Sequence, residues 1–303
     1  MSSLPHPVAV VGPTATGKSD LAVLLAERFD GEVINADAMQ LYRGMDIGTA
    51  KLTLDERRGV PHHQLDVLDV TETASVAAYQ RAARTIVEDV LARGRTPILV
   101  GGSGLYVQAV VDDLSFPGTD PQVRQKYEEE LARFGPVAMH RKLAELDPAA
   151  AAAILTSNGR RIVRALEVIE ITGEPFSANL PTPGPPRYGT VLVGLDRPAE
   201  DLDDRVDERV TRMFDSGLVD EVRRLEEKGL RHGRTASRAL GYQQVLAEFD
   251  GADDMTAAAA ETARLTRRFV RRQRSWFRRD ERINWFDAAD PELADHVRAL
   301  VNP

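Results

Sequence analysis

The sequence predicts an α/β fold in which a parallel sheet core of the P-loop NTPase type is flanked by helices and carries a helical insertion domain. Three observations support this prediction. A short apolar run at residues 8–11 leads directly into a glycine-rich segment. Short apolar runs then alternate with amphipathic helical patterns until about residue 100. Strand patterns are absent from residues 121–172 and return near residue 190.

The elements of the predicted core follow one another as strand and helix. Residues 8–11 form the first strand, and Leu21, Leu24 and Leu25 lie at helical spacing after it. Two further strands are predicted at residues 32–35 and 97–100, with a helix over residues 76–91 between them. Because a strand, a crossover helix and the next strand pair in parallel with a right-handed connection, these strands are expected to form one parallel sheet.

The second half of the sequence adds a helical segment and then resumes the core. Residues 121–172 are rich in Glu, Arg, Ala and Leu, which favour helix, and a proline-rich connection follows at residues 175–186. Strands are predicted at residues 190–195 and 283–286, and helices at residues 198–213, 219–228, 238–249 and 255–279. We therefore predict a P-loop core over residues 1–115 and 188–303 and a helical insertion domain over residues 116–187.

Composition narrows the class of protein. The 303 residues are 43% hydrophobic and 28% charged, as in ordinary globular proteins. No apolar run approaches the roughly 18 residues of a membrane span, and no secretory signal is recognisable. The expectation is a cytoplasmic monomer without a membrane partner. The chain contains no cysteine, which excludes disulfides and cysteine-ligated metals within it.

The net charge of −8 argues weakly against nucleic-acid binding, but the charge is unevenly distributed. Nine arginines lie between residues 264 and 282. A locally basic surface on an acidic protein can bind phosphates. The alternative interpretation is a solvated helix face with internal ion pairs, and the charge alone favours that alternative.

One segment matches the G-x-x-x-x-G-K-[ST] pattern of a phosphate-binding loop: Gly12-Pro13-Thr14-Ala15-Thr16-Gly17-Lys18-Ser19. It lies after a predicted strand and before a predicted helix, which makes a chance match in a surface turn improbable. Its glycines let backbone N–H groups surround phosphate oxygens at the positive end of a helix. Lys18 is expected to contact a terminal phosphate and Ser19 to bind Mg²⁺. Such loops hold diphosphates or triphosphates, including ATP.

Polar residues follow the other two predicted core strands. Asp37 comes just after the second strand, at the carboxyl edge of the sheet, where ligands bind in open α/β folds. It is a candidate base or metal ligand, and the alternatives are a helix cap or a surface aspartate. The third strand ends in Gly101-Gly102-Ser103, where nucleotide triphosphatases usually have an aspartate. Ser103 is a candidate phosphate donor there, although the same residues also suit a simple turn.

Further blocks of sequence resemble the tRNA dimethylallyltransferases, also called tRNA isopentenyltransferases. They run in the family's order from about residue 8 to 286 and are Asn35-Ala36-Asp37-Ala38-Met39-Gln40-Leu41-Tyr42, Met45-Asp46-Ile47-Gly48-Thr49-Ala50-Lys51, Val60-Pro61-His62-His63-Gln64-Leu65-Asp66, Val100-Gly101-Gly102-Ser103-Gly104-Leu105-Tyr106, Arg164-Ala165-Leu166-Glu167-Val168, Ala239-Leu240-Gly241-Tyr242 and Arg272-Gln273-Arg274-Ser275-Trp276-Phe277. Each block is weakly specific, but together they are highly specific, because P-loop kinases share only the phosphate loop. With no cysteine for a C-terminal zinc finger, the chain resembles the compact bacterial form.

The resemblance implies transfer of a dimethylallyl group from dimethylallyl diphosphate to N6 of the adenine at tRNA position 37, just 3′ of the anticodon. Asp37 matches the family's proposed general base. Ser103 matches a position, commonly Thr, that contacts the diphosphate side and guides the base. Arg209 matches the arginine that pairs with the diphosphate, and Arg205, one helical turn away, is its rival.

The resemblance also implies contacts with the tRNA anticodon stem-loop. The segment Asp37-Ala38-Met39-Gln40 and Ser103 match the lining of the adenine pocket, and Arg160-Arg161-Ile162-Val163-Arg164 matches a basic segment that meets the stem-loop. In the arginine-rich segment near the C-terminus we expect some arginines to touch RNA. Phe269, Trp276 and Phe277 lie there at helical spacing and are expected in the core. His62 and His63 are interpreted as structural.

Three other functions remain as alternatives. A small-molecule P-loop kinase shares the phosphate loop, but it usually has a metal-binding aspartate after its third strand. Gly101-Gly102-Ser103 at that place disfavours this function. An adenylate isopentenyltransferase has the same donor chemistry with free AMP as acceptor. A non-catalytic nucleotide-dependent RNA-binding module has no need of Asp37 beside the phosphate loop.

Overall fold

The computed structural model describes residues 5–179, 184–251 and 254–301. The chain forms two compact units. The first joins Met1–Val111 with Pro185–Pro303 and contains the sheet, and the second is the helical segment Asp112–Gly184. The middle of the predicted proline-rich connection, residues 180–183, lies outside the described residues.

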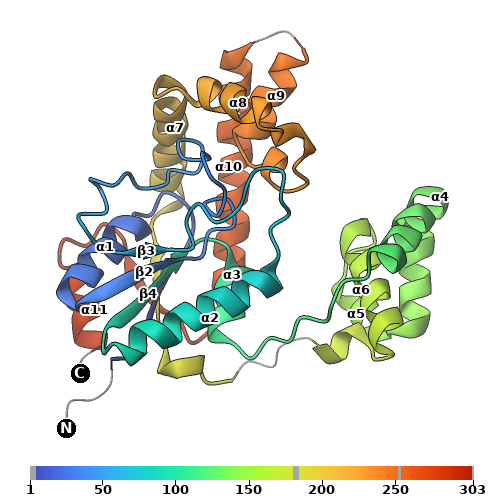
Figure 1. The fold of residues 1–303 in the computed structure, drawn as a ribbon, viewed down its shortest axis with the longest axis horizontal. Helices are drawn as coiled ribbons and strands as arrows, with labels where there is room; N and C mark the ends of the chain where they lie inside the picture. The colour runs from blue at the N-terminus through green and yellow to red at the C-terminus, as the bar shows by residue number, and fades with distance from the viewer. Residues whose placement is uncertain (1–4, 180–183, 252–253, 302–303) are drawn as a thin grey trace. The chain divides into compact units, whose positions relative to one another are not determined.

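The first unit is built on a six-stranded, fully parallel sheet with the order β3-β2-β4-β1-β5-β6 (Figure 1). The strands are β1 (Val8–Val11), β2 (Gly31–Asn35), β3 (His62–His63), β4 (Thr96–Gly101), β5 (Val191–Asp196) and β6 (Asn284–Asp287). The five predicted strands are all present within a residue or two of their predicted bounds. The two-residue edge strand β3 was not predicted, and it contains the histidine pair that the sequence identifies only as structural.

Helices cover both faces of the sheet because the central strands are apolar on both sides. Val8 and Val10 of β1 pack under α1 (Lys18–Arg28) and α11 (Leu293–Val301). Ala9 and Val11 pack on the other side, under α2 (Val76–Ala92) and α3 (Gly104–Val111). A strand buried on both faces is a continuous apolar run rather than an alternating one, which is how residues 8–11 appear in the sequence.

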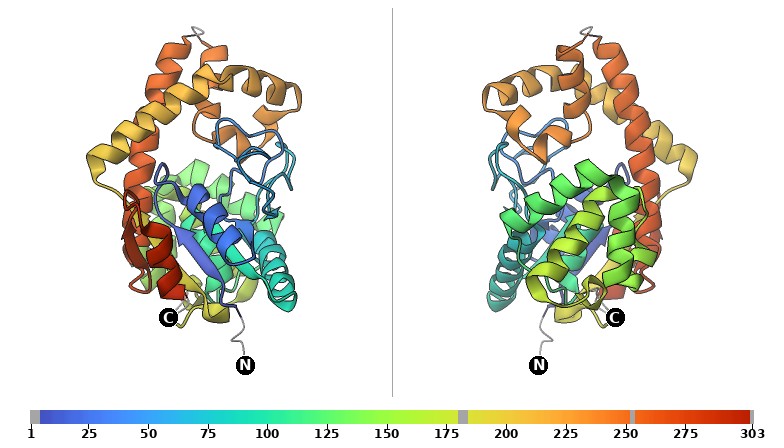
Figure 2. Two further views of the ribbon diagram at one scale, coloured as in Figure 1. Left: turned by 90° about the vertical axis from the view of Figure 1, so that its left-hand side faces the viewer. Right: turned by 90° about the vertical axis from the view of Figure 1, so that its right-hand side faces the viewer.

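Four further helices build a second layer beyond the carboxyl edge of the sheet: α7 (Ala199–Asp215), α8 (Leu218–Glu227), α9 (Tyr242–Phe249) and α10 (Met255–Phe277). In both views of Figure 2, the long helix α10 runs from the sheet to the α8–α9 pair. Leu202, Val206 and Val210 of α7 pack against Val270 of α10. In a separate apolar cluster, the loop after β2 packs against α8 and α9. These contacts place α7 and this loop beside the phosphate loop.

The second unit is helical and has a core of its own. It comprises α4 (Pro121–Leu146), α5 (Pro148–Ala153) and α6 (Gly159–Thr172). Leu143, Ile162 and Leu166 are completely buried in its core. Gly135, with φ of 76°, interrupts α4 just before Pro136, a pairing that breaks regular helix geometry. None of the described helices is long and apolar enough to cross a membrane.

A charge cluster at the amino edge of the sheet stabilises β2. The carboxylate of Glu32 is almost completely buried. It forms ion pairs with Arg93, Arg95 and His63. The hydrogen bond from Arg93 is the main reason that the pKa of Glu32 falls to about 2, and burial opposes the shift. This network accounts for His63.

The Glu32→Gln variant should be less stable at pH 7 by roughly 3 kcal/mol, the equivalent of the pKa shift from an unfolded value of about 4.5. Because the folded pKa is the lower one, this stability is present above pH 4.5 and is lost as the pH falls toward 2. Urea unfolding should therefore show a larger difference between wild type and variant at pH 7 than at pH 3. Glu261→Gln, which removes an exposed partner of Arg264, is the matched control and should change little. Equal midpoints for Glu32→Gln and wild type at pH 7 would contradict this assignment.

Candidate active site

The phosphate loop connects β1 to α1 and has the backbone that its glycines allow. Gly12, Ala15 and Gly17 have φ of 138°, 68° and 85°. A Cβ on Gly12 would lie 2.3 Å from the carbonyl oxygen of Leu195, so only glycine fits there. The buried hydroxyl of Thr16 donates to the Pro13 carbonyl oxygen over 2.9 Å and closes the turn.

The loop residues divide between two neighbouring pockets. Ala15, Gly17, Lys18 and Ser19 line the first, and Thr14 lines the second. Gly12, Pro13 and Thr16 are buried and shape the loop.

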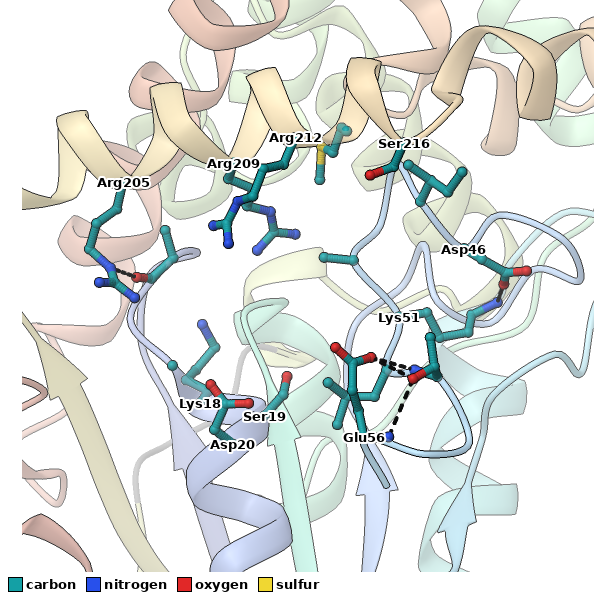
Figure 3. Close-up of a pocket in the computed structure, with 17 residues that line it drawn as sticks. Lys18, Ser19, Asp20, Asp46, Lys51, Glu56, Arg205, Arg209, Arg212 and Ser216 are labelled. Carbon is teal, nitrogen blue, oxygen red and sulfur yellow. Dashed lines mark hydrogen bonds and ion pairs between the residues drawn. The ribbon is translucent and has the colours of Figure 1, made fainter. Parts of the chain in front are cut away.

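The first pocket, here called the charged pocket, has a volume of about 490 Å³ and lies between the phosphate loop and α7 (Figure 3). Three arginines of α7 reach it from one side, and the start of α1 forms the other side. The loop after β2 closes a third side. Its charged lining residues are Lys18, Asp20, Asp46, Lys51, Glu56, Arg205, Arg209 and Arg212. The cations facing the phosphate loop make this pocket suitable for an anion with several charges.

The second pocket, here called the mixed pocket, has a volume of about 360 Å³ and combines apolar with polar walls. Its lining includes Thr14, Asp37, Ala38, Met39, Ser103, Arg209, Val210, Met213, Leu240, Phe269 and Arg272. Arg209 and Met213 line both pockets. The structure therefore brings Asp37, Ser103 and Arg209 together, and Arg209 stands where the two pockets meet.

The electrostatics of the charged pocket favour binding of an anion. Burial, followed by the nearby charge of Arg209, lowers the pKa of Lys18 to about 7, although Asp37 partly opposes the shift. The Lys18 ammonium donates to the carbonyl oxygen of Pro13. Burial also lowers the pKa of Arg209; Asp37 opposes this shift, whereas Arg212 adds to it. A bound anion would relieve this crowding of positive charge.

Asp37 is held in place through its main chain. Its N–H donates to Asn35 Oδ1 over 2.9 Å, and Asn35 Nδ2 donates back to the Asp37 carbonyl oxygen over 3.0 Å. The Ser103 hydroxyl oxygen accepts a hydrogen bond from the Ala38 N–H over 3.2 Å. Asn35 and Ser103 therefore fix the segment that carries Asp37 against the end of β4. No motif in the sequence singles out Asn35.

The structure separates the roles of the two rival arginines of α7. Arg205 Nε donates to the Ala15 carbonyl oxygen over 2.9 Å, so this side chain is tied to the phosphate loop itself. Arg209 Nη2 donates to the Thr49 carbonyl oxygen over 3.3 Å and borders both pockets. Gln40 Nε2 donates to the same carbonyl oxygen over 3.1 Å. Gln40, a predicted tRNA contact, thus uses its side-chain amide to position Thr49 and, through it, Arg209.

Two buried side chains that the sequence did not identify hold the walls of the pockets. Gln273 accepts from the Thr14 N–H and donates to the Gly102 carbonyl oxygen, both over 2.9 Å, and so joins the phosphate loop to the turn after β4. The Glu221 carboxylate accepts N–H bonds from Asp46, Ile47 and Gly48 and a hydrogen bond from the Tyr242 hydroxyl. The loop between the pockets is therefore fixed by buried polar contacts on two sides.

The predicted RNA-binding segment of α6 contains residues with different environments. Arg160 and Arg161 are exposed at the first turn of the helix. Ile162 and Val163 are buried in the core of the helical unit, so contacts of this segment with RNA, which stay a prediction, would come from its arginine side chains. The Arg164 guanidinium donates to the Pro117 carbonyl oxygen and to buried Glu167. These contacts stabilise the helical unit and restrain Arg164.

Helix α10 differs in part from the sequence interpretation. Phe277 is buried, as expected, but Trp276 is 40% exposed and Phe269 lines the mixed pocket rather than the core. A long helix that crosses from the sheet to the α8–α9 pair presents aromatic residues to different neighbours at each turn. Several arginines are in ion pairs, namely Arg267 with Asp207, Arg271 with Asp203, and Arg274 and Arg278 with Asp196. Arg272 instead lines the mixed pocket.

Comparison with known proteins identifies the family. A family model described as IPP transferase matches residues 40–280. The phosphate loop lies before that range, but the matches to the relatives described next extend over nearly the whole chain. The chain is 76% identical over 300 residues to a tRNA dimethylallyltransferase of Saccharopolyspora erythraea, covering 99% of this chain and 97% of the relative. It is 62% identical over 295 residues to a tRNA dimethylallyltransferase of Nocardia farcinica, covering 97% and 94%.

Solved structures agree with this assignment. The tRNA isopentenylpyrophosphate transferase of Bacillus halodurans superposes with a TM-score of 0.72 at 40% identity, covering 98% of this chain and 97% of that one. A eukaryotic dimethylallyltransferase described as acting on tRNA superposes with a TM-score of 0.80 at 27% identity, covering 97% of this chain and 77% of that one. With its parallel sheet, its phosphate loop and a match along nearly its whole length, the chain belongs to the IPP transferase family.

Proposed function

We propose that this chain is a transferase that moves a dimethylallyl group from dimethylallyl diphosphate to tRNA, at N6 of the adenine at position 37. The observation that carries the proposal is the position of Arg209, which lines both the pocket of Lys18 and Ser19 and the pocket of Asp37 and Ser103. A diphosphate in the charged pocket would present its ester carbon to a base in the mixed pocket. The names of the relatives supply the transferred group and the tRNA acceptor.

The charged pocket supplies the groups that a diphosphate leaving group requires. Backbone N–H groups of the phosphate loop and the positive end of α1 would face the phosphate oxygens. Arg209 adds a positive charge, and Lys18 adds another in its ammonium form, which a bound diphosphate favours. These groups stabilise the charge that develops on the diphosphate as the carbon–oxygen bond breaks.

Ser19 is the residue proposed to hold Mg²⁺. Its side chain borders the charged pocket, and among the described residues no group of three or more His, Asp or Glu side chains is placed to bind a metal. The Ser19 hydroxyl is an oxygen ligand of the kind that Mg²⁺ prefers. The ion would neutralise charge on the diphosphate.

The mixed pocket supplies the groups for the acceptor. The adenine N6 forms a bond to the ester carbon, the electron pair of the broken bond goes to the diphosphate, and the Asp37 carboxylate takes the N6 proton. Ala38, Met39 and Phe269 provide apolar walls for a flipped-out base. The Ser103 hydroxyl, which already accepts from Ala38, has its own proton to donate to the substrate.

The tRNA backbone is proposed to contact exposed arginines of the helical unit. Arg160 and Arg161 are the best candidates because they are exposed on the first turn of α6. Arg164 was expected to contribute equally, but its bonds to Pro117 and Glu167 must loosen before it can reach a phosphate. Both pockets are formed within one unit of one chain, so we propose a monomer that acts in the cytoplasm, where its tRNA substrate is found.

Binding of an anticodon stem-loop should weaken linearly in a plot of log affinity against log salt concentration, because phosphate contacts release counterions. Arg160→Gln and Arg161→Gln should each reduce the slope by about one unit, and Arg164→Gln by less. Fluorescence anisotropy over a salt series measures these slopes. Arg223→Gln, on the other unit and paired with Asp220, is the control of equal charge. Slopes identical to wild type in both the Arg160 and Arg161 variants would place the RNA surface elsewhere.

The other functions are less consistent with the site. In a P-loop kinase, the strand corresponding to β4 usually ends in a metal-binding aspartate, but here it ends in Gly101 and is followed by Gly102 and Ser103. Free AMP as the acceptor would leave the helical unit without a role. Following diphosphate release with dimethylallyl diphosphate and tRNA, AMP or a small alcohol as acceptor tests the proposal. Release that depends on tRNA supports it, and release with AMP alone would overturn it.

A further inference from the structure

Helix α7 presents a third arginine to the charged pocket in addition to Arg205 and Arg209. Arg205, Arg209 and Arg212 are spaced by four and three residues, which places them on one face of a helix. All three line the charged pocket. In Figure 3 the side chains of Arg209 and Arg212 extend from α7 into the space above Lys18 and Ser19.

The three arginines differ in what they already bind. Arg205 is bonded to the Ala15 carbonyl oxygen and Arg209 to the Thr49 carbonyl oxygen. The Arg212 side chain is exposed and makes no hydrogen bond or ion pair with any residue that the structure describes. It also borders a shallow surface depression lined by Asp204, Asp207 and Glu208. Among the described residues no ion pair joins Arg212 to any of these three carboxylates, and Asp207 pairs with Arg267.

The charge of Arg212 is directed toward the pocket. It lies close enough to Arg209 to contribute to the lowered pKa of that residue. Two guanidinium groups that repel one another at the edge of one pocket, with one of them unpaired, are stabilised when an anion binds between or beside them. The full guanidinium fork of Arg212 is available for a phosphate group.

The arrangement of the two pockets assigns the parts of the diphosphate. The reacting carbon must lie near Asp37 in the mixed pocket, so the phosphate attached to it lies at the border, beside Arg209. The terminal phosphate then lies farther inside the charged pocket, which Lys18 and Arg212 line but the mixed pocket does not share. We propose that Arg212 binds the terminal phosphate and makes this site selective for a diphosphate donor over a monophosphate. This inference rests on the proposed function and adds a specificity-determining residue to it.

The test compares two ligands that differ only in the terminal phosphate. Binding of dimethylallyl diphosphate and dimethylallyl monophosphate is measured by calorimetry with Mg²⁺ for wild type, Arg212→Gln and Arg209→Gln. Arg212→Gln should weaken diphosphate binding by about tenfold or more and monophosphate binding by less than about twofold. Arg209→Gln should weaken both. Arg223→Gln, an exposed arginine on α8 paired with Asp220, controls for the change in net charge.

The outcomes separate the inference from the function on which it depends. Equal weakening of the two ligands by Arg212→Gln, or none, would overturn the inference while leaving the transfer reaction intact. A wild type that binds neither ligand would overturn the proposed function. Fluorescence anisotropy with an anticodon stem-loop shows whether Arg212 binds RNA rather than the diphosphate. Stem-loop binding that weakens in Arg212→Gln while diphosphate binding is unchanged would assign Arg212 to RNA and contradict the proposal.

Discussion

Asp37→Asn should lower the single-turnover rate of dimethylallyl transfer to tRNA by roughly 10²–10⁴-fold, the usual scale for loss of a general base. Asparagine has the shape of aspartate and can still hydrogen-bond, but it cannot accept the N6 proton. The position of residue 37 should survive the change, because Asn35 and Ser103 hold this segment through its main chain. Binding of tRNA and dimethylallyl diphosphate should therefore remain close to wild type.

Rapid-quench measurements with enzyme in excess isolate the chemical step in this comparison. Asp215→Asn makes the same chemical change at an exposed position at the end of α7 and serves as the control. A near wild-type single-turnover rate for Asp37→Asn would show that Asp37 only binds substrate. A higher Mg²⁺ requirement without a change in the saturated rate would instead make Asp37 a metal ligand.

Lys18→Ala should weaken dimethylallyl diphosphate binding and slow the chemical step together, with a loss of at least about 10² in kcat/KM. The reason is that the ammonium group lies in the charged pocket and acts on the bound diphosphate and on the leaving group alike. Calorimetry gives the first effect and single-turnover kinetics the second. A variant that keeps both near wild type would show that the diphosphate binds elsewhere.

The pH dependence of binding provides a second test of Lys18. The pKa of Lys18 is about 7 without ligand, and a bound diphosphate raises it because it favours the ammonium form. Binding therefore takes up a proton above pH 7, and affinity should fall as the pH rises from 7 to 9. Lys18→Met removes this dependence. Because the unfolded pKa is higher, at 10.5, the free protein gains stability from pH 7 toward 10.5, and Lys18→Met should stabilise it at pH 7 or below.

The sequence predicted the elements and residues whose signals are local. The phosphate loop, the central strands and the position of Asp37 depend on short sequence patterns, and such patterns indicate the local structure directly. The two-residue strand β3 has no periodicity to detect. Ile162 and Val163 belong to a segment that resembles a tRNA-binding segment of the family, but a helix turns about 100° per residue and directs these two side chains into the core.

Residues that act across the fold could not be predicted in this way. Gln273 bonds to the phosphate loop 259 residues away and to the turn after β4 171 residues away. Glu221 binds a loop that precedes it by more than 170 residues. The different partners of Arg205 and Arg209 also appear only in the structure, because both residues lie on one helix face in the sequence pattern.

The proposed reaction requires that a diphosphate in the charged pocket meets a tRNA adenine in the mixed pocket, beside Arg209 and Asp37. Mass spectrometry of an anticodon stem-loop after a single turnover with dimethylallyl diphosphate and Mg²⁺ tests it most directly. We expect one dimethylallyl group on N6 of the adenine at position 37, with one diphosphate released for each group transferred. An unmodified stem-loop alongside prenylated free AMP, or a phosphoryl group transferred in place of the prenyl group, would contradict it.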